Sequence, residues 1–262
     1  MLQNYPYPCA AALAAILAPV TFGISLVSAQ APPSGIIEKD NREIIDSWDH
    51  PWSAIGKIFT PKFSAVDACT ATLVAPRLVV TAAHCLFDSV SKKPIQPSAI
   101  HFVAGFRREK HLGHSLAECV SFNADYDFGK KLSLESVETD YAFVVLKKEF
   151  SVKPVPIFKK DQLTKTDRLI HAGYGRDRKF VLSAHKGCHV RYRQRNAYLS
   201  DCDTMKGASG GPILIRNSDD YYIAGVMAAA GVYNTPEGEK LFNSFAGITR
   251  DRQNLRHLAS CK

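Results

Sequence analysis

Ser209 is the first residue whose surroundings indicate chemistry. It lies within GASGGP, residues 207–212, directly before the apolar run 213–215. Glycine on both sides allows a tight turn that exposes the hydroxyl and lets backbone N–H groups converge on one point. The N–H groups of Gly207 and Ser209 are therefore candidate donors to an oxyanion. An ordinary glycine-serine turn is the alternative, because short motifs also arise by chance.

A serine hydroxyl is a weak nucleophile near neutral pH, so the hypothesis requires a base and a group that orients it. His84, in TAAHC at residues 81–85, is the candidate base, and a buried structural histidine is the alternative. Asp140 opens the apolar run DYAFVVL and is the candidate carboxylate. Asp125 and Asp127 compete with it, but their segment has the composition of a loop.

The elements that would position these groups are short runs of β-branched and aromatic residues separated by Gly, Pro, Asn and Asp. This pattern predicts an all-β protein built from barrels. The expected strands cover residues 53–59, 70–74, 78–81, 100–104, 141–147, 169–172, 179–185, 212–216, 221–228 and 244–249. Residues 249–260 predict a closing α-helix, with Thr249 as its N-cap and Leu255 and Leu258 on the packed face.

Composition excludes several other classes of protein. The chain has 262 residues, of which 46% are hydrophobic and 22% charged, which fits neither a disordered chain nor a fibre. The net charge of +8 favours acidic partners without identifying one. Arg191, Arg193 and Arg195 alternate and would share one face of a strand. Because no aromatic stacking platform accompanies them, we interpret them as a solvated face and expect no nucleic-acid binding.

The first 29 residues contain no Asp, Glu, Lys or Arg. An apolar run at residues 10–20 followed by Val-Ser-Ala suits a signal peptide cleaved before Gln30, and an uncleaved anchor is the alternative. We expect a signal peptide at 1–29, a linker or short pro-segment at 30–43 and one domain at 44–262. The mature protein would be secreted or periplasmic, monomeric and without stable membrane association.

Cysteine usage agrees with export. Cys9 lies in the expected signal peptide, and an even number of cysteines remains, which predicts three disulfides in an oxidising compartment. The six are Cys69, Cys85, Cys119, Cys188, Cys202 and Cys261. The spacing of His111 and His114 suits a zinc site, but no third ligand is evident nearby, so we interpret the segment as a loop. We predict no metal and no cofactor.

The three motifs TAAHC, DYAFVVL and GASGGP, in this order, resemble the chymotrypsin-like (trypsin-like) serine endopeptidases, in particular bacterial secreted members. The resemblance extends over residues 44–262. It implies two six-stranded antiparallel β-barrels with a C-terminal helix. It also implies that His84 is the general base, that Asp140 orients it, that Ser209 attacks the peptide carbonyl, and that Gly207 and Ser209 form the oxyanion hole.

The same resemblance implies a Cys69–Cys85 disulfide beside the histidine and a Cys188–Cys202 disulfide before the serine. Cys119 and Cys261 are then left for each other. Proteins or peptides are the implied substrates. A non-catalytic binding module on the same fold is the alternative function.

Specificity depends on the residue six positions before the serine, which in the family lies at the base of the pocket for the P1 side chain. Here it is Asp203, which favours Lys or Arg. The following Thr204 completes a pattern that also resembles glutamyl endopeptidases, whose pocket uses a histidine on the next strand; Met227 occupies that place here. Ala228 and Ala230 would line the same pocket. A small or apolar P1 residue is the third alternative.

Activation is expected to differ from that of trypsin-like enzymes, which place an aspartate directly before the serine to bind a newly cut N-terminus. Here Ala208 takes that position, so cleavage near Arg42 need not switch the enzyme on. Met205 stands where the family has a cysteine, and Cys202 is displaced from it. Lys206, beside the expected pocket, would favour acidic substrate residues.

Overall fold

The structure is a computed structural model that describes residues 35–60, 68–160, 162–235, 238–258 and 260–261. These residues belong to one compact unit, residues 32–262. The expected signal peptide lies outside the described residues, as does the first part of the expected linker. Within the described part of the chain, no helix is long and apolar enough to cross a membrane.

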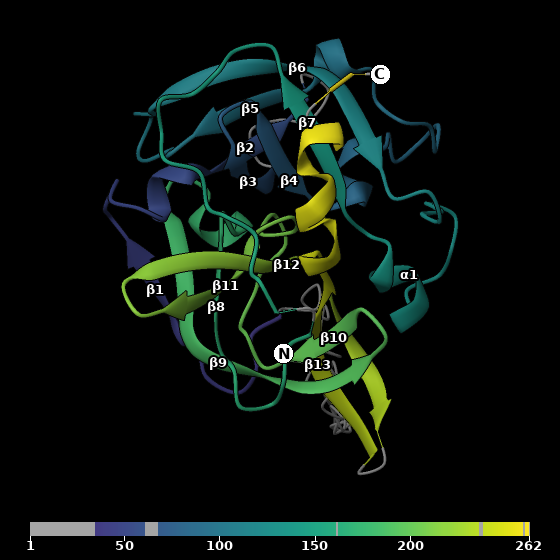
Figure 1. Cartoon of the computed structure of the whole chain (residues 1–262). Coiled ribbons are helices and arrows are strands. Elements are labelled where there is room, and N and C mark those ends of the chain that lie inside the picture. The colour runs from purple at the N-terminus through teal and green to yellow at the C-terminus, as the bar shows by residue number, and fades with distance from the viewer. Residues whose placement is uncertain (1–34, 61–67, 161, 236–237, 259, 262) are drawn as a thin grey trace, which may run out of the picture. The chain divides into compact units, whose positions relative to one another are not determined.

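Six antiparallel strands close into a first barrel (Figure 1). In barrel order they are β2 (Ile55–Phe59), β3 (Cys69–Ala75), β4 (Leu78–Thr81), β7 (Ala142–Leu146), β6 (Gly113–Phe122) and β5 (His101–Ala104). Every residue of β4 and β7 is buried, since one face fills the barrel and the other contacts the rest of the domain. Such strands appear in the sequence as continuous apolar runs rather than as alternating patterns.

A second sheet contains seven strands. Their order is β1 (Arg42–Ile45), β9 (Leu182–Gln194), β10 (Ala197–Ser200), β13 (Gly238–Gly247), β12 (Asp220–Thr235), β11 (Pro212–Asn217) and β8 (Arg168–Gly173). Because β8 also pairs with β9, six of these strands form a ring, and β1 adds to it along β9.

The helices are short. They are η1 (Trp52–Ala54), η2 (Ala83–Leu86), η3 (Pro97–Ala99), α1 (Leu134–Glu138), η4 (Arg176–Arg178), η5 (Thr249–Asn254) and α2 (Leu255–Leu258). Leu255 and Leu258 pack against the main hydrophobic core, which includes buried residues of both barrels. Beyond α2, the Cys119–Cys261 disulfide joins the end of the chain to β6.

The all-β prediction is confirmed, and so is the double-barrel architecture. The closing segment differs in detail, because it begins as the 3₁₀ helix η5 and Ile248 rather than Thr249 is its N-cap, with no capping side chain. Strands β1, β6 and β10 and helix α1 were not anticipated from the sequence. β6 carries polar and small residues such as Gly113, so pairing with both β5 and β7, rather than strand propensity, accounts for its form.

The expected linker at residues 30–43 also needs correction over its described part. Residues 42 and 43 begin β1, which pairs with β9, and the side chain of Arg42 is buried. The prolines and charges of this segment suggested a loose connection. Its charges instead form ion pairs with the domain, which a composition pattern does not reveal.

Candidate active site

His84 and Asp140 are brought together by strand pairing. His84 lies in η2, just beyond the end of β4, and Asp140 lies two residues before the start of β7. The two strands are antiparallel neighbours in which Thr81 pairs with Ala142, so the end of one meets the start of the other. His84 Nδ1 lies 2.7 Å from Asp140 Oδ2, and the backbone N–H of His84 donates to Oδ1 at 2.9 Å.

This contact fixes the state of the imidazole. With Nδ1–H donated to Asp140, Nε2 is the nitrogen left to exchange a proton. Burial would lower the pKa of His84, but the charge of Asp140 and its hydrogen bond outweigh burial, so the pKa is raised. The side chain of His84 keeps 31% of its surface exposed, which leaves it accessible to a reacting group.

Ser209 lies on a turn that only glycine allows. Gly207 has φ +98° and Gly210 has φ +79°, in the left-handed region that favours glycine. A Cβ at Gly210 would lie 2.2 Å from the carbonyl oxygen of Thr70. Both barrels hold this turn, because Thr70 N–H donates to Ser209 O and Gly210 N–H donates to Met227 O, each at 2.8 Å.

Two backbone donors beside the serine are available to a ligand. Among the described residues, neither the N–H of Gly207 nor that of Ser209 donates a hydrogen bond, whereas Ala208 N–H donates to Met205 O at 2.9 Å. An unengaged pair of amides beside a nucleophile is the arrangement an oxyanion hole requires.

His84 and Ser209 line one cavity of about 480 Å³, together with Gly207. No hydrogen bond joins Ser209 Oγ to His84 within the described residues, and His84 Nε2 lies 3.6 Å from Cys85 Sγ. Loose geometry of this kind is common in active sites without substrate and tightens when a substrate binds. The cavity therefore brings together the candidate nucleophile, the candidate base and the candidate oxyanion donors.

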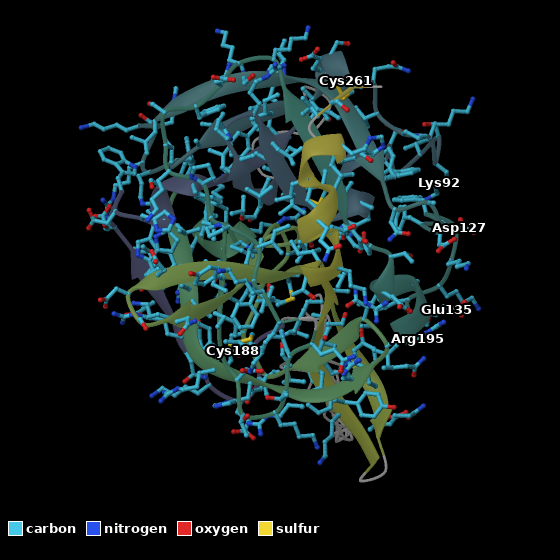
Figure 2. All side chains as sticks on the ribbon, viewed as in Figure 1. Lys92, Asp127, Glu135, Cys188, Arg195 and Cys261 are labelled. Carbon is cyan, nitrogen blue, oxygen red and sulfur yellow. A yellow bond between two sulfur atoms is a disulfide. The ribbon has the colours of Figure 1, made fainter. Side chains whose placement is uncertain are left out.

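The described residues contain three disulfides. Two of them have the pairings that the resemblance implied, and the third joins the two cysteines that were left for each other. They are Cys69–Cys85, Cys188–Cys202 and Cys119–Cys261. Cys85 is the residue after His84, and both cysteines of the Cys69–Cys85 disulfide line the same cavity as His84. Figure 2 labels Cys188 within the second barrel and Cys261 at the chain end beside β6.

A metal centre at this position is excluded chemically. Ligand atoms of Cys69, His84 and Cys85 lie within 4.8 Å of one another, the one such group of three among the described residues. Both sulfurs are joined in a disulfide, so neither is a thiolate that could bind a metal. The segment of His111 and His114 was interpreted from the sequence as a loop. In the structure His114 belongs to strand β6, and its Nε2 lies 2.9 Å from Nδ1 of His101.

Asp203, the expected partner of a substrate cation, is closed off in this structure. Its side chain has no exposed surface, and its two oxygens accept hydrogen bonds from the backbone N–H groups of Ile37 and Asn41, each at 2.8 Å. The geometry therefore gives no support to a role of Asp203 in binding Lys or Arg. Nothing in the sequence indicated these partners, because they lie more than 160 positions away.

Thr204 is also buried, and its hydroxyl contacts a histidine that sequence reasoning missed. His171 Nε2 lies 3.0 Å from Thr204 Oγ1, and its Nδ1 lies 3.3 Å from Pro212 O. Burial lowers the pKa of His171 to about 4, so the ring is neutral, and Nε2 accepts a hydrogen bond from the Thr204 hydroxyl. A histidine within the apolar run 169–172 was the available signal.

The other three expected substrate residues lie on β12. The side chain of Met227 is in the core of the second barrel, and its backbone N–H donates to Gly211 O at 2.9 Å, behind the serine turn. Ala228 is buried and lines a second cavity, of about 270 Å³, with His84 and Asp140. Ala230 is half-buried and pairs with Asn243 of β13.

The arginines interpreted as a solvated face each have a partner. Arg191 pairs with Asp201, and Arg193 donates to Gln162. Arg195 lies beyond the end of β9 and pairs with Glu138 of α1 at 3.0 Å, and Figure 2 shows it beside that helix.

Two β-barrels, a histidine–aspartate pair and a serine on a glycine turn define a class of protein, the serine hydrolases of double-barrel fold. Residues 69–221, more than half of the chain, match the family described as "Trypsin-like peptidase domain". The chain belongs to this family, which makes it a serine peptidase in general terms.

A solved structure titled "Structure of Glu endopeptidase in complex with MPD" has the same fold. The two share 20% sequence identity, with a TM-score of 0.69, over 87% of this chain and 100% of that chain. At this identity the likeness concerns the fold.

Proposed function

We propose that the protein is a secreted serine endopeptidase. The observation that supports this most is the His84–Asp140 pair, which lines the same cavity as Ser209 and its two unengaged amides. Three disulfides favour an oxidising compartment, outside the cell or in a periplasm. The proposal includes proteins or peptides as substrates and a monomeric state.

In the first half of the reaction, Ser209 Oγ attacks the scissile carbonyl while His84 Nε2 takes the hydroxyl proton. The oxyanion of the tetrahedral intermediate accepts from the N–H groups of Gly207 and Ser209. The C–N bond then breaks, the amine leaves with the proton from His84, and an acyl-enzyme remains.

In the second half, water attacks the acyl carbon and gives a proton to His84. Collapse of the second intermediate breaks the bond to Ser209 Oγ, and the proton returns to the serine. Asp140 stabilises the imidazolium in both halves, because it remains charged and hydrogen-bonded to Nδ1.

For the P1 side chain we propose an uncharged, small or apolar residue. The carboxylate of Asp203 is occupied by backbone amides, and β12 contributes Met227 and Ala228 rather than a histidine. Lys or Arg at P1 would require Asp203 to exchange its present partners. Glu at P1 would find no histidine on β12 to pair with its carboxylate.

The test is mass-spectrometric mapping of cuts made by the purified protein in a diverse peptide mixture, with Ser209→Ala as the control. Serine-dependent cuts support the endopeptidase, and the residue before each cut reports P1. Absence of cuts, together with retained peptide binding by both proteins, would favour the binding module instead. Cuts that persist in Ser209→Ala would exclude the assigned nucleophile.

A further inference from the structure

Residues 35–42, named here the strap, lie against the segment that leads to Ser209. The strap pairs with that segment at Gly35 and Thr204, where Thr204 N–H donates to Gly35 O at 3.0 Å. Asn243 Nδ2 donates to the same oxygen at 2.6 Å. A Cβ at Gly35 would lie 2.6 Å from atoms of both Thr204 and Asn243, so the strap requires glycine at this close approach.

Asp203 holds the middle of the strap. Oδ1 accepts from Ile37 N–H at 2.8 Å, and Oδ2 accepts from Asn41 N–H at 2.8 Å and from Asn41 Nδ2 at 3.0 Å. His185 Nδ1 accepts from Asp203 N–H at 2.8 Å and lies 3.2 Å from Oδ2. Burial would raise the pKa of Asp203, but the hydrogen bonds from Ile37 and Asn41 of the strap favour the charged form, and the pKa is lowered.

Arg42 holds the end of the strap. Its guanidinium keeps only 4% of its surface exposed and pairs with Asp40 at 2.9 Å and Asp177 at 2.6 Å. Arg178 adds a bond to Arg42 O at 2.8 Å. Because Arg42 already lies in β1, opposite His185 of β9, the bond between Arg42 and Glu43 is inside a paired strand. A peptidase needs an extended, accessible segment, so this bond is protected while the strap is docked.

The strap reaches the oxyanion donors by two routes. Asp203 and Thr204 begin the segment that ends at Gly207 and Ser209. Arg42 and Asp177 pack over Gly175, where a Cβ would lie 3.1 Å from Arg42 Nη1 and 2.5 Å from Asp177 Oδ1. The next residue, Arg176, donates its N–H to Lys206 O at 2.7 Å, in the peptide unit that precedes Gly207.

We propose that Asp203 and Arg42 are positioning residues, and that the strap, uncut, keeps the amides of Gly207 and Ser209 aimed at the oxyanion. This inference rests on the proposed peptidase function. Internal amides at Ile37 and Asn41 satisfy Asp203, and Ala208 offers no carboxylate to a new chain end. Cleavage after Arg42 therefore inactivates the enzyme rather than activating it.

The first test compares Asp203→Asn with Asp46→Asn, which alters an exposed carboxylate paired with Arg108. Asparagine keeps the shape of the side chain but offers one acceptor oxygen, and its NH₂ group faces the strap donors. We expect kcat to fall about 10- to 100-fold in Asp203→Asn, as a misplaced catalytic group would produce, with KM and the P1 profile unchanged. A rise in KM or a loss of selectivity for Lys or Arg would overturn the proposal in favour of substrate binding by Asp203.

A second measurement does not need peptidase activity. Amide hydrogen exchange at residues 203–211 is expected to accelerate in Asp203→Asn and in Arg42→Ala, and to stay at the wild-type rate in Asp46→Asn. Unchanged exchange in both strap variants would contradict the proposal even if the protein cuts no peptide. Accelerated exchange in a protein without peptidase activity would instead leave the strap contact standing and exclude the proposed function.

The third test uses an arginine-specific peptidase under native conditions. The bond after Arg42 should resist cleavage in wild type and be cut faster in Asp203→Asn, and peptide-cleaving activity should fall in step with the cut. A rapid cut after Arg42 in wild type, followed by a rise in activity, would overturn the proposal.

Discussion

Two aspartates of this protein make nearly the same hydrogen bonds and serve different ends. Asp140 accepts from the backbone N–H and Nδ1 of His84, and Asp203 accepts from the backbone N–H groups of Ile37 and Asn41. The partner of Asp140 is an imidazole with a second nitrogen facing a cavity. The amides that donate to Asp203 do not titrate, and the imidazole of His185, whose Nδ1 lies 3.2 Å from Oδ2, accepts from the backbone N–H of Asp203. A carboxylate at the expected sequence position therefore indicates a catalytic role only when its partner, such as an imidazole, can exchange a proton with a reacting group.

The two halves of the site also differ in how they are held. The register of β4 and β7 places His84 and Asp140, so local pairing within one barrel suffices. The serine turn is held by Thr70 in the first barrel and Met227 in the second, and the segment that leads to it contacts the strap at Asp203 and Thr204. The serine half is therefore expected to be the more sensitive to distant changes.

The largest expected effect is loss of the nucleophile. Ser209→Ala should reduce kcat on the order of 10⁶-fold, because the remaining residues act only through binding and the oxyanion hole. Peptide hydrolysis measured alongside Asp46→Asn checks this. Activity within tenfold of wild type would contradict the assignment of Ser209.

The next largest effect is expected for Asp140, which acts through the pKa and orientation of His84. Asp140→Asn should reduce kcat about 10⁴-fold through loss of imidazole orientation. In wild type, kcat/KM should rise with pH through a His84 pKa above 6.5, because the base must be neutral and Asp140 raises its pKa. In Asp140→Asn this limb should move to lower pH, since the raising charge is gone. A limb that stays in place would break the proposed link between the two residues.

Gly210→Ala should destabilise the serine turn by about 3 kcal/mol or more, because the residue has a positive φ and its Cβ would overlap Thr70 O. Gly187→Ala is the matched control. Its φ is also positive, but its Cβ would meet only the flexible side chain of Arg168. Urea unfolding of both variants measures the difference, and equal losses would show that the contact with Thr70 is unimportant.

A smaller effect is expected for the stability that the charge of Asp203 contributes, about 1.5–3 kcal/mol for a carboxylate accepting hydrogen bonds. Because the folded pKa is lowered, this contribution is present above the unfolded pKa and is lost as pH falls through the folded pKa. The difference in unfolding free energy between wild type and Asp203→Asn should therefore shrink from pH 6 to pH 3. A constant difference would indicate a contribution that does not depend on charge.

The apolar runs along the chain sufficed to predict an all-β protein built from barrels, and the resemblance to the chymotrypsin-like endopeptidases implied that there are two. Residue types and their order also sufficed to nominate His84, Asp140 and Ser209. The reason is physical: a strand buried on both faces is a continuous apolar run, and a serine on a tight turn needs glycine beside it. His114 and His171 were harder to place, because a histidine in a short strand leaves no periodic signal.

What only the tertiary structure decided is the use of Asp203 and of residues 35–42. The composition of residues 35–42 suggested a linker, and the sequence position of Asp203 suggested a pocket that binds a substrate Lys or Arg. The strap and Asp203 are distant in the chain, so their contact depends on how β1 adds to β9 and on which donors reach a buried carboxylate first. Chemistry carried by neighbouring residues can be predicted from the sequence. Which distant hydrogen-bond donors reach a buried carboxylate such as that of Asp203 depends on how the whole chain packs.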